Sequence, residues 1–414
     1  MPGNSVFIER RRKLMESLPP RSLAVVPPAS PKTVSADAKH IEPSRNLYYL
    51  TGISQEGTWL VMFRTEGDER NEMLFIEPFD PEYEKWVGRR LTVEEASSKS
   101  GVPVVRTDRG WRSAIESAIA RHSIRNLFVD FPLSGIGGRQ GTRHRLALDL
   151  RDAYTHLVHD RLSGPIHLMR MVKDRDEIRT MKRAVEITGQ AFRAAAKALE
   201  PGMRECEFEA ELMRVFIASG AHPAFPVIAA GGPRATCLHY SENGQVLDKG
   251  SLLLADFGAT FDWYASDITR TLPVGGRFSR RQRHLMDLVI RIQSEAIRLL
   301  KPGITLGEWN AAVNDRYAAM LAAAGVIPEA KDLEKVYYHR IGHHLGLDTH
   351  DEALPDVPVQ AGMVVTVEPG LYIAEEGVGI RIEDDVLVGA KRNTVLSSDI
   401  PKTPDDIERL MRSR

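Results

Sequence analysis

The chain has 414 residues, of which 43% are hydrophobic and 27% are charged, as is usual for a globular protein of two domains. Its 55 lysines and arginines nearly balance its 56 aspartates and glutamates, so no overall charge favours nucleic acid or a membrane surface as a partner. Only two cysteines occur, and no apolar run approaches the ~18 residues of a membrane span, which excludes a disulfide framework and predicts a cytoplasmic protein.

Residues 1–165 predict a mixed α/β domain. Short apolar runs separated by Pro, Gly and Asp are typical of strands, and the runs at 23–26, 47–50, 59–63, 73–76 and 127–129 have this form. We find no catalytic constellation in this part of the chain. The stretch Leu162-Ser163-Gly164-Pro165 predicts a boundary, and residues 166–414 are expected to form a second domain.

The second part of the chain predicts a pair of helices that occurs twice. Asp174 and Glu177 form a capping box ahead of an apolar stripe, and the helix is expected to end at a Pro-Gly pair. Ser279 and Gln282 repeat the capping box before a second such helix and a second Pro-Gly pair. An amphipathic helix follows each pair. We interpret the pattern as a degenerate internal duplication, with two unrelated helical hairpins as the alternative.

Acidic residues lie inside otherwise apolar strands in each half. Residues 252–269 predict a hairpin, and a turn centred between Phe261 and Asp262 places Asp256 opposite Asp267. Cross-strand neighbours have Cβ atoms about 4.5–5.5 Å apart. Two carboxylates at that distance repel each other unless a cation or a proton lies between them.

Asp256 also begins the triplet Asp-Phe-Gly, which binds magnesium in protein kinases. A kinase requires an H-R-D-x-x-x-x-N loop upstream of this triplet, and the sequence has none. The triplet therefore needs another explanation.

The second half repeats the acidic hairpin. Residues 363–388 predict two strands around a turn at Glu375 and Glu376, which sets Glu368 opposite Glu383. A single acidic residue in a strand is usually solvated or salt-bridged, because a buried carboxylate without a partner is costly. Four in matched register predict a metal site.

Histidines are dense between the two hairpins. The segment YYHRIGHHLGLDTHDE holds four of the chain's 13 histidines: His339, His343, His344 and His350. An isolated histidine is usually a hydrogen-bonded core residue, but this density beside the carboxylates favours ligand and proton-transfer roles. His239 is a weaker candidate, for which a structural role is the alternative.

Four carboxylates and one imidazole suit two divalent cations that share oxygen ligands. An oxygen-rich shell with one nitrogen favours Mn²⁺, and Co²⁺, Fe²⁺ and Zn²⁺ are alternatives. Such a pair lowers the pKa of a shared water molecule and yields hydroxide at neutral pH. The sequence therefore predicts hydrolysis of an amide or an ester.

These motifs resemble those of the pita-bread dinuclear metallopeptidases, and most of all the Xaa-Pro aminopeptidases (aminopeptidase P). The resemblance rests on S-D-I-T-R-T, H-x-x-G-H-x-L-G-L-D-x-H-D, T-V-E-P-G-L-Y-I and G-I-R-I-E-D-D, and on SRNLYYLTGI and KWVGRRL in the first domain. It implies an α+β fold, in which a pita-bread catalytic domain of duplicated helices and antiparallel strands follows an N-terminal α/β domain.

The resemblance also implies a role for each site residue. The metal ligands would be Asp256, Asp267, His343, Glu368 and Glu383, with Asp267 and Glu383 shared by both ions. Glu368 would accept a proton from the attacking water, His239 and His350 would hold the substrate, His339 would line the site, and Arg381 would orient carboxylates. Two residues depart from the family pattern, since a large aromatic is expected at His344 and an alanine at Phe257. The first departure leaves open which of the adjacent histidines is the ligand.

The implied activity is release of an N-terminal residue from peptides with proline in second position, by attack of a hydroxide that bridges two metal ions. Prolidase, which cleaves Xaa-Pro dipeptides, is the first alternative, although the short segment 374–379 favours the aminopeptidase. A metal-free binding protein of the same fold and a creatinase-like hydrolase are further alternatives. The resemblance also implies a homodimer or a homotetramer.

Overall fold

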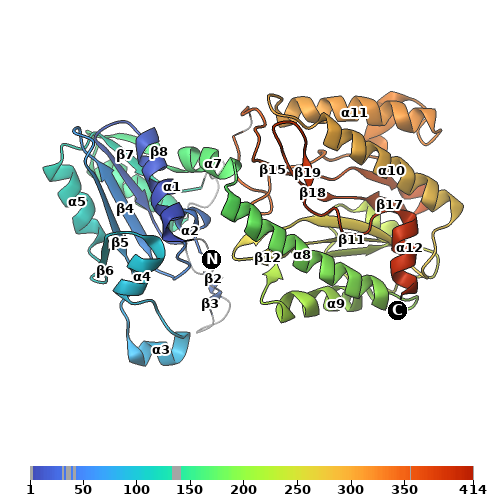
Figure 1. Cartoon of the computed structure of the whole chain (residues 1–414), viewed down its shortest axis with the longest axis horizontal. Helices are drawn as coiled ribbons and strands as arrows, with labels where there is room; N and C mark the ends of the chain where they lie inside the picture. The colour runs from blue at the N-terminus through green and yellow to red at the C-terminus, as the bar shows by residue number, and fades with distance from the viewer. Residues whose placement is uncertain are drawn as a thin grey trace. The chain divides into compact units, whose positions relative to one another are not determined.

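The computed structural model describes residues 3–29, 32–33, 39–40, 43–132, 141–354 and 356–413. The chain forms two compact units, Met1–Arg170 and Met171–Arg414 (Figure 1). The boundary expected after Pro165 lies inside helix α7, Ser163–Met171, at the end of the first unit. Within the described ranges, no helix has both the length and the apolar character needed to cross a membrane.

The first unit is built on a six-stranded mixed sheet in the order β6-β5-β4-β1-β7-β8. Strand β1 pairs with β4 in the antiparallel and with β7 in the parallel direction. The elements of this unit are α1 (Asn4–Ser17), β1 (Ser22–Val26), β2 (Lys32–Thr33), β3 (Lys39–His40), α2 (Arg45–Thr51), β4 (Trp59–Arg64), β5 (Arg70–Phe75), α3 (Pro81–Val87), α4 (Val93–Ser100), β6 (Val104–Arg106), α5 (Trp111–Arg121), β7 (Asn126–Val129), α6 (Thr142–Ala153), β8 (Val158–Arg161) and α7.

One of the five predicted strands in this unit is wrong. Residues 47–50 belong to helix α2, not to a strand. Ser44 caps the start of the helix by accepting a hydrogen bond from the backbone N–H of Leu47, and Gly52 ends it in the left-handed region at φ 68°. A run of four apolar residues fits a buried strand and a buried helical turn equally well, so the caps decide.

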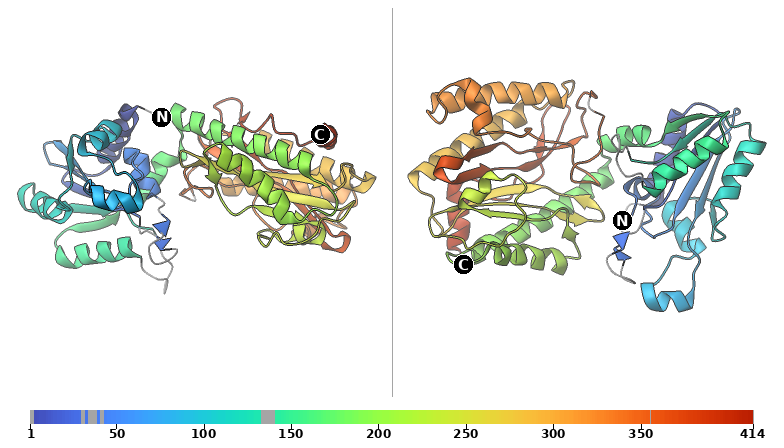
Figure 2. Two further views of the ribbon diagram at one scale, coloured as in Figure 1. Left: turned by 90° about the horizontal axis from the view of Figure 1, so that it is seen from below. Right: turned by 180° about the vertical axis from the view of Figure 1, so that it is seen from behind.

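The second unit contains two helix pairs and a set of short antiparallel strands. Figure 1 and the right-hand view of Figure 2 show the helix pairs α8–α9 and α10–α11 on opposite sides of the strands. The elements are α8 (Arg175–Ala198), α9 (Glu205–Ala218), β9 (His222–Pro223), β10 (Ile228–Gly231), β11 (Leu252–Phe257), β12 (Ala259–Phe261), β13 (Tyr264–Ala265), β14 (Ile268–Pro273), α10 (Arg280–Leu299), α11 (Leu306–Ala323), β15 (Val364–Val367), β16 (Gly370–Ile373), β17 (Val378–Arg381), β18 (Asp384–Leu387), β19 (Thr394–Val395) and α12 (Pro404–Arg412), with 3-10 turns η1 (Gly232–Thr236), η2 (Ala330–Lys335) and η3 (Ala374–Glu376).

The internal duplication is visible in the hydrogen bonds. Both predicted capping boxes form, at the starts of α8 and α10. After α8, the backbone N–H of Gly202 donates to Leu247, whose own N–H donates to Met203. After α10, the backbone N–H of Gly303 donates to Val359, whose own N–H donates to Ile304. The same exchange therefore joins each Pro-Gly turn to its half of the unit.

The register of the second hairpin is confirmed. The ladders β15–β18 and β16–β17 share one register on either side of a short gap, and η3 forms the turn. Glu368 and Glu383 lie in that gap, opposite each other. Each of them thus sits between two ladders that hold its backbone.

The register predicted for the first hairpin is wrong by two residues. Asp256 pairs with Thr269 in the β11–β14 ladder, not with Asp267. The turn lies at Asp262 and Trp263, which both have positive φ (45° and 68°), as a tight two-residue hairpin turn requires. Because the error is two residues, the alternation of strand sides is unchanged, and Asp267 directly precedes β14 as Glu383 directly precedes β18.

Candidate metal centre

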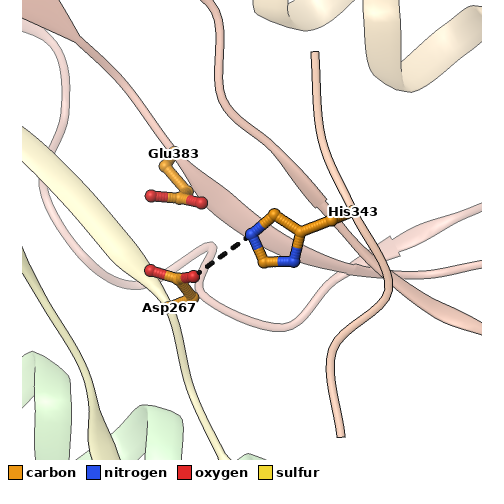
Figure 3. Close-up of side chains that lie close together, drawn as sticks. All are labelled: Asp267, His343 and Glu383. Atoms are coloured by element: carbon orange, nitrogen blue, oxygen red, sulfur yellow. Dashed lines mark ion pairs between the residues drawn. The ribbon is translucent and has the colours of Figure 1, made fainter. Parts of the chain in front are cut away.

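Three predicted ligands come together at the centre of the second unit. Asp267, His343 and Glu383 each present one donor atom, and these atoms all lie within 4.8 Å of one another. Figure 3 shows the three side chains pointing toward one another, Asp267 from just before β14, Glu383 from just before β18 and His343 from a loop. The Nε2 atom of His343 lies 3.4 Å from Oδ2 of Asp267.

The tautomer of His343 suits a ligand. Its Nδ1 atom lies 3.0 Å from the backbone carbonyl of His344. A carbonyl oxygen only accepts, so Nδ1 carries the proton and the lone pair of Nε2 faces the carboxylates. The backbone N–H of His343 donates to Oγ1 of Thr366 at 3.0 Å, which fixes the backbone of the loop that carries His343. A histidine whose second nitrogen is held in this way is typical of metal sites.

Glu368 is a third acidic residue beside this cluster. Its Oε1 atom lies 3.6 Å from Nε2 of His343 and 3.4 Å from the hydroxyl of Thr366, which donates to it. Its Oε2 atom lies 3.8 Å from Nδ1 of His339. Glu368 is therefore close enough to contribute a donor atom to the same ion as Asp267, His343 and Glu383.

Asp256 is joined to the cluster through Arg381. The guanidinium of Arg381 donates to Oδ2 of Asp256 at 2.6 Å and to the hydroxyl of Thr269 at 3.1 Å. Thr269 in turn donates to Oε2 of Glu383 at 2.7 Å. The other oxygen of Asp256, Oδ1, is buried and has no hydrogen-bond partner within the described part of the chain.

Burial and mutual repulsion raise the pKa values of the acidic groups in the cluster. Burial, followed by the charges of Glu383, Asp256 and Glu368, raises the pKa of Asp267 well above its usual value. Burial likewise raises the pKa of Glu368 to about 8 and that of Glu383 well above its usual value. Each shift favours the neutral acid in the absence of a cation.

These observations fit a divalent cation site. A cation would stabilise the ionised carboxylates, supply a partner for Oδ1 of Asp256 and accept the lone pair of His343. Burial, with His350 as the next cause, lowers the pKa of His343 to about 4, so its imidazole is neutral at pH 7, as a ligand must be.

The remaining predicted residues surround the cluster. The ring of His350 lies 4.1 Å from that of His343, centroid to centroid, and His350 is exposed, as is His239. His339 points its Nε2 atom at the hydroxyl of Tyr372, 2.8 Å away. His344 is buried, and its neighbours are the ion pair Lys173–Asp351 rather than the central carboxylates.

Two structural details answer questions raised by the sequence. His343, not His344, faces the carboxylates, although the two are adjacent. Phe257, the middle residue of the Asp-Phe-Gly triplet, is fully buried and stacks on Phe192 of α8 with ring centroids 5.9 Å apart. Gly258 is required by close approach, because a Cβ there would lie 1.8 Å from the carbonyl oxygen of Ser266.

Two residues that hold the site were missed in the sequence, Thr269 and Thr366, and so was the hydrogen-bonding role of Tyr372. Thr269 follows Asp267 by two positions and Thr366 precedes Glu368 by two, so strand alternation puts each threonine on the same side as its carboxylate. That spacing was the available signal. Tyr372 is buried and its hydroxyl accepts from Arg381 at 3.0 Å, which no local pattern indicates.

Sequence models of two known domains match this chain. "Metallopeptidase family M24" matches residues 179–390, and "Aminopeptidase P, N-terminal domain" matches residues 7–128. The chain belongs to metallopeptidase family M24. The expected α+β fold, with a pita-bread domain after an N-terminal α/β domain, is confirmed by these matches and by solved structures.

Relatives in family M24 resemble the chain over its whole length. The Xaa-Pro aminopeptidase of Haemophilus influenzae is 32% identical over 98% of this chain and 96% of its own. A protein of Bacillus anthracis assigned as an aminopeptidase P has a structure with a TM-score of 0.96 and 34% identity, covering 100% of this chain and 99% of that one. Zn-substituted Escherichia coli aminopeptidase P in complex with product has a TM-score of 0.87 and 29% identity over 100% and 99%. Membership of this metallopeptidase family and the donor set together make the cluster a divalent metal site.

Removal of metal should abolish activity and leave the M24 domain folded. The second unit has its own apolar core, in which large side chains such as Trp309, Phe208 and Phe216 are fully buried. Treatment with a chelator should therefore leave the far-ultraviolet circular dichroism spectrum unchanged while hydrolysis stops. Loss of helical signal on chelation would mean that the metal is needed for folding, as in small zinc domains.

Proposed function

We propose that the protein is a metal-dependent Xaa-Pro aminopeptidase, which hydrolyses the bond between an N-terminal residue and a following proline. The observation that carries this proposal is the convergence of Asp267, His343 and Glu383, with Glu368 beside them, in a chain whose full-length relatives are Xaa-Pro aminopeptidases. A metal-free binding protein is less consistent with the complete donor set, and prolidase is less consistent with these relatives.

We propose five ligands for two divalent ions: Asp256, Asp267, His343, Glu368 and Glu383. Asp267 and Glu383 occupy equivalent positions in the two halves, which supports their being shared by both ions. Two such ions lower the pKa of water and polarise a carbonyl group. Mn²⁺ is our proposal for the native metal, because carboxylate oxygens dominate the donor set.

Residues of the chain carry out proton transfer and hold the substrate. Glu368 is the group placed to accept a proton from the attacking water and to pass it to the departing amine. His350 and His239 are exposed beside the cluster and can donate hydrogen bonds to a substrate carbonyl, which stabilises negative charge that develops there. His339, held by Tyr372 and by the backbone carbonyl of Arg340, lines the site as a neutral imidazole.

Arg381 acts on the carboxylates and not on the substrate. Its side chain is 5% exposed, and its donors are occupied by Asp256, Thr269 and Tyr372. It fixes the direction of Asp256 directly and that of Glu383 through Thr269. We propose it as a positioning residue.

The substrate preference is testable with three peptides. We expect release of the first residue from a tripeptide with proline second, little action when alanine replaces that proline, and slow action on the Xaa-Pro dipeptide. The reason is that a bond to proline is a tertiary amide without an N–H, so a site adapted to it differs from that of a general aminopeptidase. The measurement is kcat/KM for each peptide with Mn²⁺ added.

Two outcomes would change the assignment. Turnover confined to the dipeptide would make the protein a prolidase. Equal rates on the proline and alanine tripeptides would remove the proline specificity altogether. The turn between the motifs T-V-E-P-G-L-Y-I and G-I-R-I-E-D-D is short, with η3 spanning Ala374–Glu376. It leaves little room for the additional residues that a dipeptidase is expected to use to bind the proline carboxylate.

A homodimer or homotetramer and a cytoplasmic location remain predictions. Static light scattering on the purified chain tests the first, and localisation of a tagged chain tests the second.

A further inference from the structure

A fully buried carboxylate outside the metal centre makes four hydrogen bonds to one segment. Glu205 is the first residue of α9 and has no exposed surface. Its Oε1 atom accepts from the backbone N–H of Gly231 at 2.9 Å and from Nε of Arg234 at 2.7 Å. Its Oε2 atom accepts from the hydroxyl of Tyr240 at 2.8 Å and from the backbone N–H of Gln245 at 2.9 Å.

These four donors mark both ends and the interior of segment 231–245, which connects β10 to β11. The backbone N–H of Glu205 also donates to the carbonyl of Gln245 at 2.9 Å, so the far end of the segment is held twice. Asn243 adds a second attachment: it is 2% exposed, and its side chain bonds Ala229, Val227 and Glu209 of α9. The N-terminal turns of α9 therefore hold this segment against β10.

The same segment and strand β10, which leads into it, lie against the metal centre. In β10, Ile228 pairs directly with Asp256. In η1, the carbonyl of Ala235 lies so close to β17 that a Cβ on Gly379 would meet it at 2.3 Å, and β17 ends in Arg381. Tyr338, next to His339, donates its hydroxyl proton to the carbonyl of Thr236.

His239 is the residue of this segment to which the proposed function gives a role. It is exposed and lies immediately before Tyr240, one of the four donors to Glu205. Three residues before His239, the carbonyl of Thr236 accepts from Tyr338, the neighbour of His339, so the segment is fixed beside the site on this side.

We propose that Glu205 is a positioning residue for the peptidase reaction, acting by holding segment 231–245 so that His239 faces the substrate. The inference rests on the proposed role of His239. Glu205 itself touches neither the metal centre nor, from its burial, the substrate.

The carboxylate is needed because all four partners donate. Glutamine in its place keeps the shape but turns one oxygen into an NH₂ group, which then faces at least one N–H of the segment, donor against donor. The segment should loosen while the helices and the metal ligands stay in place. Glu207, two residues along α9, is exposed, and within the described part of the chain its carboxylate bonds only the backbone N–H of Arg204, so Glu207→Gln is a matched control.

The test is a double-mutant cycle on a Xaa-Pro-Xaa tripeptide. His239→Ala should lower kcat/KM on the order of 10²-fold, the cost of losing one donor to a developing oxyanion. Glu205→Gln should lower it by roughly 10-fold or more, since a displacement of about 1 Å at a positioned group has effects of this size. The double variant should be no worse than His239→Ala alone, because the two changes remove one interaction.

Two further readouts separate positioning from general damage. Metal content should match that of the wild type in every variant, and amide hydrogen exchange should accelerate in 231–245 alone. If Glu205→Gln does not fold, Tyr240→Phe removes a single donor and should show a smaller loss that also vanishes in the His239→Ala background.

Additive losses, or a Glu205→Gln enzyme with full activity, would overturn the inference and leave the aminopeptidase assignment intact. Full activity of His239→Ala would overturn it as well, by removing the role that Glu205 serves. Absence of tripeptide turnover in the wild-type protein would instead contradict the proposed function.

Discussion

Replacing Glu368 by Gln should lower kcat by more than the ~10²–10⁴-fold expected for loss of general-base action alone. The amide accepts no proton, and it also removes one negative charge from the cluster that would hold the cations. Glu368 suits both roles, because its Oε1 atom lies 3.6 Å from Nε2 of His343 and its carboxylate therefore lies beside the three central residues.

The measurement is kcat on the proline tripeptide, with metal content determined on the same sample. Glu375→Gln is the control: Glu375 is an exposed residue of η3, and its variant should retain wild-type turnover. A Glu368→Gln enzyme within tenfold of the wild-type kcat would remove Glu368 from the proton transfer. Reduced metal content with a normal rate per bound metal would leave it a ligand only.

His343→Ala and His350→Ala should both be nearly inactive, for different reasons. His343 presents the lone pair of Nε2 to Asp267 and Glu368, so its loss should reduce bound metal. His350 lies 4.1 Å from it, ring to ring, and belongs to the exposed side of the site, so its loss should leave metal in place and slow turnover. Elemental analysis of the purified variants separates the two.

The reverse pattern would show that the ligand is misassigned. His344→Ala completes the experiment, because His344 faces Lys173 and Asp351 and should bind metal normally. Metal loss in His344→Ala together with normal content in His343→Ala would mean that the adjacent histidines exchange roles in the metal-bound protein.

The helices of the second unit were predictable because their signals are local. The capping boxes of Asp174 with Glu177 and of Ser279 with Gln282 each lie within four residues, and both form as expected. The second hairpin was predictable for a similar reason, since its turn at Glu375 and Glu376 is flanked by apolar runs that stop there. Local chemistry was enough to position both.

The first hairpin and helix α2 were not predictable in the same way. The turn at Asp262 and Trp263 places a tryptophan at positive φ, which its side chain does not favour, so no residue preference indicates it. In α2, the run 47–50 has no periodicity that distinguishes helix from strand. The caps Ser44 and Gly52 decided the helix, and no local signal decided the turn.

The metal cluster followed from motif spacing, whereas the network behind it did not. Asp267, His343 and Glu383 were expected together because acidic residues interrupt apolar strands in each half and because their motifs resemble those of the Xaa-Pro aminopeptidases. The bonds that join Tyr372 to both Arg381 and His339 depend on how β16, β17 and a loop approach one another. Such distances between segments are set by the whole fold, so sequence patterns do not reveal them.

The position of the two halves in the chain has a consequence for biosynthesis. Asp267 precedes β14 and donates its backbone N–H to Asp385, while Glu383 precedes β18 and donates its own to Thr269. Each half thus supplies one of the two central carboxylates, and next to each carboxylate a hydrogen bond from the backbone N–H joins that half to the other half. A nascent chain that has emerged only as far as β17 lacks Glu383 and with it this closure. The centre therefore has its full set of carboxylates only after the segment that carries Glu383 has been synthesised, so a chain that ends before Glu383 offers metal an incomplete site.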